Sequence, residues 1–198
     1  MLTGTSRFAA LLATLGIALP ITAAPTTTTS APTSQPTSGA TAMRLVISSK
    51  AFGTNQPIPR AYTGEGQDTS PDLSWSGGPA AAEYALICDD PNAPRPEPWV
   101  HWVLYKIPAN QSSLKAGLDS TGTPKDAGGA LQGKNSWDTL GYRGPLPPPG
   151  HGTHHYHFRL YALDTPLKVG AGLTKAELLA AMKGHVLGEV ELVGTYKR

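Results

Sequence analysis

Four of the six histidines fall within seven residues, directly after a run rich in proline and glycine. This segment reads as the start of a strand, in which alternate side chains share one face. His154 and Tyr156 then point to the same side as the apolar Phe158, whereas His155 and His157 point to the other side. Because an apolar face is buried, we expect the imidazole of His154 and the phenol of Tyr156 to lie at one end of the interior.

Clustered histidines also suggest a metal site, since imidazole is a common ligand. Strand alternation, however, divides the four between two faces, so a zinc site would need ligands from elsewhere, such as His101 and Asp90. The single cysteine, Cys88, excludes a cysteine-based zinc site and an intramolecular disulfide. We therefore expect neither a metal nor a cofactor.

An acidic pair, Asp89 and Asp90, follows the apolar run Tyr84–Cys88 and precedes two prolines, Pro91 and Pro94. The prolines fix the backbone, so a carboxylate here is held in place. It could orient a histidine in a binding site. The alternative is a tight turn in which the aspartate only accepts hydrogen bonds from its own backbone.

A lone histidine, His101, lies in an apolar strand. Alternation puts it on the face of Val103 and Tyr105, away from Trp102 and Leu104. An imidazole in such a place must be hydrogen-bonded, because an unpartnered buried polar group costs a few kcal/mol. It is either a satisfied core histidine or one member of a polar cluster that faces it.

The segment Lys134–Tyr142 is a polar loop that leads into the proline-rich run. Asn135 and Ser136 are suited to bond the backbone, and Trp137 to cover a pocket. The alternative is an ordered surface loop.

Elements that could position these groups are mostly strands. The 22 glycines and 19 prolines indicate a loop-rich, mainly β chain. One helix is well specified, because Thr174 and Glu177 have the spacing of a capping box and Gly184 ends the segment. Leu178, Leu179 and Met182 would form its apolar stripe. The strands are predicted at Arg44–Ser48, Tyr84–Cys88, Val100–Ile107, Tyr156–Leu163 and Gly188–Tyr196.

The N-terminal residues have the organisation of an exported protein. Residues 1–24 read as a signal peptide, with Arg7 before a short apolar stretch and small residues before a cleavage site. Residues 25–42 are uncharged and rich in Thr, Ser, Pro and Ala, which predicts a disordered linker. Residues 43–198 form one domain. We expect a secreted or periplasmic protein without stable membrane insertion after cleavage.

Several function classes are excluded by composition and motifs. A net charge of +2 without any Lys/Arg run does not suit nucleic-acid binding. The sequence lacks a Gly-x-Ser-x-Gly elbow, a phosphate-binding P-loop, a dinucleotide fingerprint and a His-Glu-x-x-His motif. Cys88 lies in an apolar strand, where a thiolate is disfavoured. The remaining groups suit binding of a phosphate or carboxylate better than turnover.

Several motifs in order resemble the phosphatidylethanolamine-binding protein (PEBP) family. They cover essentially all of residues 43–198, and the last resembles its bacterial and archaeal Raf-kinase-inhibitor-like branch (YbhB/YbcL type). The resemblance implies a PEBP-like β-sandwich, with a large central antiparallel sheet, a smaller packed sheet and peripheral short helices. The motifs are Ser70–Trp75, Asp90–Pro94, Trp99–Trp102, Gly144–Tyr156 and Gly184–Tyr196.

The resemblance also implies a small cavity for anions such as phosphate or phosphorylethanolamine. One departure is Asn92, where the family usually has an acid. If this position faces the pocket, the amide repels a phosphate less; if it caps the turn, Asn does the same work as Asp. The ligand-binding residues carried over are Asp90, Pro94, His101, Gly144, Pro145, His154 and Tyr156.

In this interpretation His101 and His154 supply N–H donors, Tyr156 supplies an O–H donor, and Asp90 fixes a histidine tautomer. Histidine has an ordinary pKa of about 6.5 and a phosphate ester a second pKa of about 6. We therefore expect the affinity to depend steeply on pH between about 5 and 8.

Three functions remain open. The first is an exported, non-enzymatic protein that binds a small anionic or phosphorylated ligand and modulates a protein target such as a protease or kinase. The second is a hydrolase that uses Asp90, His101 and His154 as acid and base. The third is an envelope interaction protein with a vestigial cavity. A homodimer is compatible with each.

Overall fold

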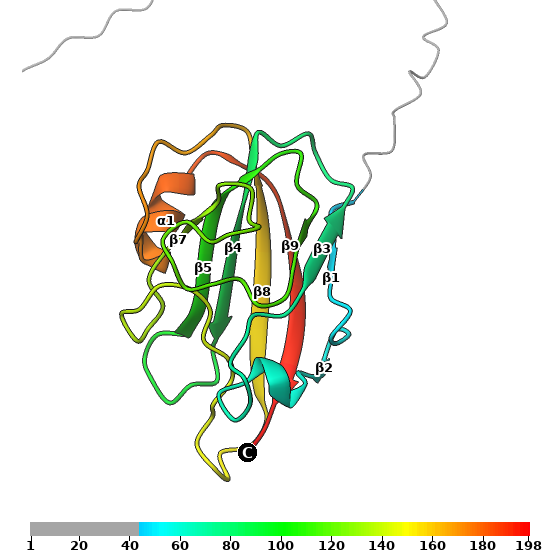
Figure 1. Ribbon diagram of the computed structural model, residues 1–198, viewed down its shortest axis with the longest axis vertical. Helices are drawn as coiled ribbons and strands as arrows, with labels where there is room; N and C mark the ends of the chain where they lie inside the picture. Colours follow the sequence, from blue (N-terminus) through cyan, green and yellow to red (C-terminus); the bar gives the residue numbers. More distant parts are fainter. Residues whose placement is uncertain (1–43) are drawn as a thin grey trace, which may run out of the picture. The chain divides into compact units, whose positions relative to one another are not determined.

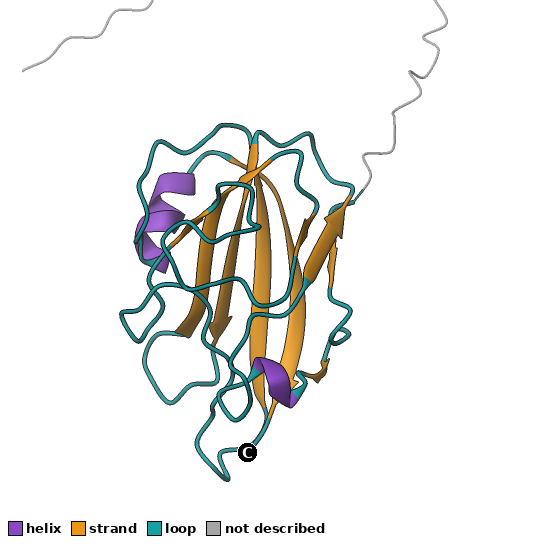
Figure 2. Ribbon diagram, viewed as in Figure 1, coloured by secondary structure: helices purple, strands orange, loops and turns teal. Residues whose placement is uncertain are grey.

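The structure, a computed structural model, describes residues 44–198. The expected signal peptide (1–24) and linker (25–42) lie outside the described residues. Two sheets dominate the described part, with one short α-helix and one 3-10 turn, η1 (Arg60–Tyr62), beside them (Figures 1 and 2). The predicted mainly β architecture, with a large sheet, a smaller sheet and peripheral helices, is confirmed.

The large sheet has six strands in the order β2-β9-β8-β4-β5-β7, and all pairs are antiparallel except β2 with β9. The expected strands all form, and the central ones run further than the apolar runs that predicted them. The strands of this sheet are β2 (Gln56–Pro57), β4 (Glu83–Asp90), β5 (Trp99–Pro108), β7 (Leu131–Gln132), β8 (His154–Leu163) and β9 (Val186–Tyr196).

The smaller sheet has three strands in the order β1-β3-β6. Only β1 was expected; β3 and β6, like β2 and β7, were missed. They are four residues long or shorter, too short for the alternation of apolar and polar side chains to stand out. The strands are β1 (Val46–Ser48), β3 (Leu73–Ser76) and β6 (Ser113–Leu114).

Both faces of the large sheet are covered, so β4 is buried along its whole length. On one face, Leu86 and Cys88 pack with Leu73 and Trp75 of the smaller sheet. On the other face, Ala85 and Ile87 belong to a second apolar cluster that includes two side chains of the helix. A strand covered on both sides reads as a continuous apolar run, as this one does in the sequence.

Helix α1 (Lys175–Met182) begins at the predicted capping box. Thr174 accepts a hydrogen bond from the Glu177 backbone, and the Glu177 side chain bonds back to Thr174. Gly184 follows with a φ of 83°, as its predicted role of ending the helix requires. Leu178 and Met182 are buried, but Leu179 is 40% exposed. The prediction that Leu179 belongs to the buried stripe is wrong, because the helix packs on the sheet only through the face that carries Leu178 and Met182, four residues apart.

None of the helices in the described range, 44–198, has the length and apolar character needed to cross a membrane.

A first prediction concerns the packing of β9 against the β1–β2 segment. A Cβ at Gly194 would lie 2.5 Å from Cγ1 of Ile58 and 2.8 Å from the Phe52 ring, so Gly194→Ala overpacks the core. We expect it to lower the free energy of unfolding by roughly 1–3 kcal/mol in urea titrations. The matched control is Gly188→Ala in the same strand, whose Cβ would meet Pro79 at an ordinary 3.4 Å. Equal stability of the two variants would contradict this account of the packing.

Candidate functional site

An irregularity in β5 sets the position of His101. Cys88 of β4 pairs with Trp102, but Asp89 pairs with Val100, so His101 is an extra residue on β5. An extra residue of this kind is a β-bulge; it interrupts the alternation of side chains and is common beside binding sites.

The predicted face of His101 is therefore wrong. Val103 and Tyr105 lie in the cluster on the helix side of the sheet. His101 instead contacts Tyr156, a member of the cluster between the two sheets, with ring centroids 5.1 Å apart and planes at 88°. The bulge turns His101 to the same side as Trp102, which strict alternation could not predict.

The His101 ring is held through one nitrogen. Nδ1 donates to the Arg143 carbonyl at 2.6 Å, and the Arg143 N–H donates to the His101 carbonyl at 2.9 Å. Burial is the main influence on the imidazole and lowers its pKa from the ordinary value of 6.5, against opposing effects that include the Arg143 carbonyl and Asp90. The neutral ring that results carries its proton on Nδ1 and a lone pair on Nε2.

Asp90 serves both purposes weighed in the sequence analysis. Its Oδ1 accepts the Asn92 N–H at 2.8 Å, which caps the turn after β4. Its Oδ2 accepts the Nδ1–H of His154 at 2.6 Å, and both side chains are buried. Asn92 faces away from this pair: its Oδ1 accepts the backbone N–H of His155 at 2.9 Å. Asn92 therefore joins the turn to β8.

His154 makes a second contact that the sequence did not indicate. Its Nε2 lies 2.7 Å from Nδ1 of His151, a residue of the loop before β8. Since His154 donates its Nδ1 proton to Asp90, a neutral His154 accepts the His151 proton at Nε2. Asp90, His154 and His151 thus form a chain of hydrogen bonds from the end of β4 to the surface.

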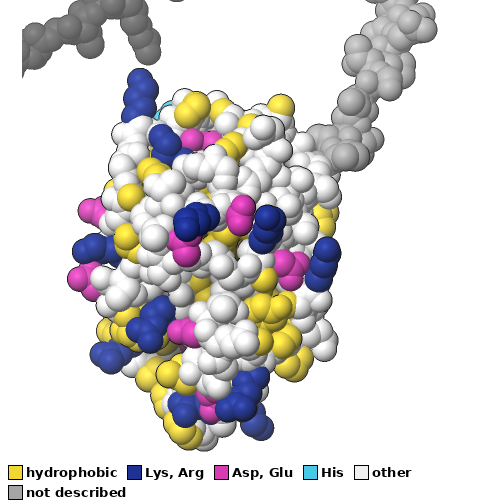
Figure 3. Space-filling view, viewed as in Figure 1, with side chains coloured by type: hydrophobic (Ala, Val, Ile, Leu, Met, Phe, Trp, Pro, Cys, Tyr) yellow, Lys and Arg dark blue, Asp and Glu magenta, His cyan; other side chains and the backbone are white. Residues whose placement is uncertain are grey.

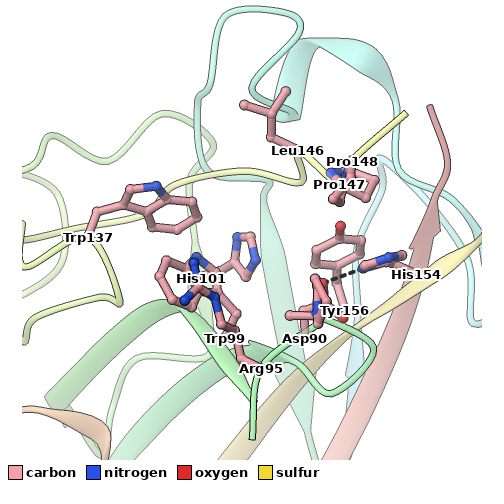
Figure 4. A pocket seen from close by; sticks show the side chains of 12 residues that line it. Asp90, Arg95, Trp99, His101, Trp137, Leu146, Pro147, Pro148, His154 and Tyr156 are labelled. Atoms are coloured by element: carbon pink, nitrogen blue, oxygen red, sulfur yellow. Dashed lines mark hydrogen bonds and ion pairs between the residues drawn. The ribbon is translucent and has the colours of Figure 1, made fainter. Parts of the chain in front are cut away.

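The Tyr156 hydroxyl is buried and has no hydrogen-bond partner among the described residues. Burial, followed by the negative charge of Asp90, raises the pKa of the phenol well above its usual 10, so the hydroxyl keeps its proton. In Figure 4 the Tyr156 ring is seen between His101 and His154, and its hydroxyl points toward Pro147 and Pro148.

These groups meet in a cavity of about 220 Å³, below the usual size of a site for drug-sized ligands. Five of the predicted site residues line it. The lining also includes side chains that were not among the predicted binding residues. Trp99 lies two residues before His101, and Pro147 and Pro148 belong to the predicted proline-rich wall. The lining residues are Asp90, Ala93, Pro94, Arg95, Trp99, His101, Trp137, Leu146, Pro147, Pro148, His154 and Tyr156.

The other two predicted residues, Gly144 and Pro145, do not line the cavity. Their backbone hydrogen bonds hold the segment that leads into the lining prolines. The Gly144 N–H donates to Asp68 at 2.6 Å, and a Cβ on Gly144 would collide with the Tyr62 carbonyl oxygen. The Gly64 N–H donates to the Pro145 carbonyl at 2.9 Å. The close backbone approach explains the glycine, and it fixes the start of the proline-rich wall.

The loop before that wall behaves as predicted. Asn135 and Ser136 bond neighbouring groups, including the N–H of Val100, which donates to Ser136 Oγ at 2.8 Å. Trp137 covers the cavity, with its ring 5.2 Å from that of Trp99 and 5.2 Å from that of His101.

Two arginines lie against the tryptophans at the cavity rim. The Arg95 guanidinium is 5.5 Å from the Trp99 ring centroid, and that of Arg143 is 4.9 Å from Trp137. Cation–π contacts of this length hold the charge near the rim. Elsewhere, the face seen in Figure 3 shows basic and acidic side chains interspersed, as expected for a nearly neutral protein.

A second hollow, of about 500 Å³, lies on the other side of the first residues of β5, between Val100, Lys134 and the start of α1. Its lysines are already paired, Lys134 with Asp138 and Lys175 with Asp89. The cavity at Tyr156 is the stronger candidate because it contains a buried donor to which no described residue offers an acceptor.

Fold and site together define a two-sheet β-sandwich with a small cavity at the end of its central strands, in which a few polar side chains lie among apolar ones. The chain belongs to the phosphatidylethanolamine-binding protein family, whose family model matches residues 48–197. A "UPF0098 protein" of Methanothermobacter thermautotrophicus is 48% identical over 153 residues, covering 77% of this chain and 98% of that protein.

Two solved structures of this family are similar to the described domain in fold and sequence. A homologue of the family from Chlamydia trachomatis is 37% identical, with a TM-score of 0.70 over 78% of this chain and 98% of that one. YbcL of Escherichia coli is 29% identical, with a TM-score of 0.73 over 78% of this chain and 99% of that one. The resemblance read from the motifs is confirmed.

A second prediction follows from the burial of His101. Because the folded-state pKa is below the unfolded value of 6.5, the unfolded chain binds more protons below that pH. The contribution of neutral His101 to stability is therefore complete above pH 6.5 and is lost as the pH falls. Urea unfolding at pH 7.5 and 5.5 should show a larger loss for the wild type than for His101→Gln, and an NMR titration of His101 should give a midpoint below 6.5. A midpoint at or above 6.5 would refute it.

Proposed function

We propose that this protein binds a small anionic ligand, such as phosphate or a phosphorylethanolamine head group, in the cavity at Tyr156, without chemical turnover. The observation that carries the proposal is the buried Tyr156 hydroxyl, which has no hydrogen-bond partner within residues 44–198. Leaving such a group unpaired costs about 1–3 kcal/mol. A ligand oxygen in the cavity would accept this hydrogen bond and remove the cost.

Charge at the rim supports an anion. Arg95 lines the cavity and stacks on Trp99. Arg143 stacks on Trp137 and lies 3.8 Å from Asp68, so part of its charge is compensated. The nearest acid, Asp90, has one oxygen bonded to the Asn92 backbone and the other to His154. Its charge is thus partly compensated before a ligand arrives, and the arginines attract the ligand to the opening.

Size supports a head group alone. A cavity of about 220 Å³ holds a phosphoryl group and a few further atoms but leaves no room for acyl chains. A lipid would therefore have to keep its chains outside. The same pocket accepts a phosphorylated residue of a partner, and we propose that a protein target such as a protease or kinase is modulated in this way. Export to the periplasm or exterior, and a homodimer, belong to the same proposal.

The hydrolase alternative has less support. The lining residues include no serine, threonine or cysteine. The hydroxyl that they do include, that of Tyr156, has a raised pKa and is a poor nucleophile. The hydrogen-bond chain of Asp90, His154 and His151 is suited to fix ring orientations.

A third prediction tests the binding role of Tyr156. Tyr156→Phe removes the unpartnered hydroxyl and keeps the buried ring. Because a hydrogen bond to a charged group contributes about 1.5–3 kcal/mol, we expect calorimetric titration to show at least tenfold weaker phosphate binding. The free energy of unfolding without ligand should be unchanged or slightly higher.

The matched control is Tyr142→Phe. Tyr142 is also buried, but its hydroxyl donates to the Tyr62 carbonyl at 2.8 Å and it does not line the cavity. This variant should lose stability and keep phosphate affinity. Unchanged phosphate affinity in Tyr156→Phe, or no phosphate binding by the wild type, would favour a vestigial cavity; ester hydrolysis that is lost in His154→Ala would favour the hydrolase.

A further inference from the structure

Two polar side chains that line the cavity and whose rings contact each other, Tyr156 and His101, have different hydrogen-bonding characters. The Tyr156 hydroxyl can donate, since its own proton is retained and no acceptor in the described chain takes it. His101 donates its Nδ1 proton to the Arg143 carbonyl, which, as a carbonyl, can only accept. The Nε2 atom of a neutral His101 is therefore an acceptor.

This assignment differs from the expectation that His101 provides an N–H to the ligand. That role would require a second proton on a ring that is almost completely buried. The carbonyl contact does not relieve the requirement, because both the neutral and the protonated ring donate through Nδ1. The choice between donor and acceptor at Nε2 depends only on the second proton.

We propose that the cavity selects a phosphoryl group that carries a P–OH, which donates to His101 Nε2 while another oxygen accepts from Tyr156. This inference rests on the proposed function. The proton stays on the phosphoryl group, and no bond is made or broken. Inorganic phosphate meets the requirement at neutral pH, and a terminal phosphate monoester meets it when singly protonated. Sulfate and phosphate diesters have no such hydroxyl.

The charged and titratable groups around His101 come from several elements. Asp89 and Asp90 at the end of β4, and Asp68 before β3, each favour the protonated ring, but burial outweighs them. From β8 the ring meets Tyr156, and Asp90 is bonded to His154. From the loop before the proline-rich wall it meets Trp137, on which the Arg143 guanidinium stacks. The neutral form dominates at neutral pH.

His101 Nε2 thus distinguishes phosphate monoesters from phosphate diesters. The phosphate of a phospholipid that carries a head-group alcohol, such as phosphatidylethanolamine, is a diester, and it cannot supply a donor to Nε2. A phosphorylated side chain and phosphorylethanolamine are monoesters with a second pKa of about 6, so they can. The selection favours a terminal phosphoryl group over the same group inside a lipid head.

The fourth prediction compares anions of similar size and shape on the full chain. Titration calorimetry at constant ionic strength measures inorganic phosphate, sulfate, methyl phosphate and dimethyl phosphate at pH 7.5 and 5.5. To donate to sulfate, His101 must be protonated, and with a pKa below 6.5 less than about a tenth of it is protonated at pH 7.5. We expect phosphate to bind at least tenfold more tightly than sulfate at pH 7.5, and the ratio to narrow at pH 5.5.

The esters distinguish the source of the phosphoryl group. Methyl phosphate should bind more tightly at pH 5.5 than at pH 7.5, whereas dimethyl phosphate should resemble sulfate. Equal affinity for phosphate and sulfate at pH 7.5 overturns the inference and leaves the proposed anion site standing. Binding of none of the four anions at either pH overturns both.

A variant series assigns the selectivity to His101. His101→Gln places an amide where it can rotate to donate at any pH, so the ratio of phosphate to sulfate affinity should fall toward one and lose its pH dependence. The control His185→Gln changes a half-exposed histidine paired with Asp164, remote in the sequence from the cavity residues, and should keep the wild-type ratio. If His101→Gln keeps the wild-type ratio of phosphate to sulfate affinity, the role proposed for His101 Nε2 is overturned. The wild-type comparison of phosphate with sulfate stands without either variant.

Discussion

Strand β5 has one residue more than β4 between two successive pairs, Cys88–Trp102 and Asp89–Val100, and the extra residue is His101. With regular alternation its imidazole would point to the helix side of the sheet, away from Tyr156 and Asp90. The bulge turns it to the cavity, and the exchange of backbone hydrogen bonds with Arg143 then fixes the ring and joins β5 to the start of the proline-rich wall. The position of His101 at the cavity, its contact with Trp137 and its hydrogen bond to Arg143 all depend on this irregularity.

The regular elements of this fold follow from local rules, and the site depends on exceptions to them. The apolar run of β4, the alternation of β8 and the capping box at Thr174 predict what forms, because each depends on neighbours in sequence. The bulge depends on how β5 pairs with β4, and one sequence carries no sign of it. Motif resemblance nevertheless assigned His101 to the pocket, although periodicity placed it on the opposite face. Leu179 fails for a related reason: the width of the buried helix face is set by the sheet beneath it.

Contacts that depend on loop geometry, or that join residues far apart in the sequence, could not be predicted either. His151 and His154 are neighbours in sequence, but their hydrogen bond depends on the loop geometry set by the wall. The support of Gly144 by Asp68 spans 76 residues. An unpartnered hydroxyl, as at Tyr156, is a property of the packed structure alone. A second buried donor without a partner among the described residues, Trp75 Nε1, lines neither the cavity at Tyr156 nor the second hollow. An orphan donor therefore indicates a ligand only where there is space for one.

Asp89 and Asp90 show how adjacent residues divide structure from binding. They point to opposite faces of the sheet. Asp89 is bonded to Arg159 and to Lys175, so two cations neutralise it and hold the first residue of α1 to the sheet. Asp90 has no such cation and is stabilised by a backbone N–H and by His154. The charge that remains at the cavity is therefore that of Asp90. An anion binds beside Asp90 in one of two cases. Either the ligand donates a hydrogen bond to the nearest acceptor atoms, or its attraction to the rim arginines exceeds its repulsion by the Asp90 carboxylate. Both arginines stack on tryptophans at the rim of the cavity, whereas His101 is buried. Hydrogen bonding therefore governs the buried end of the cavity. There a P–OH that donates to His101 lowers the repulsion between the ligand oxygen and the ring nitrogen, where the arginines act least.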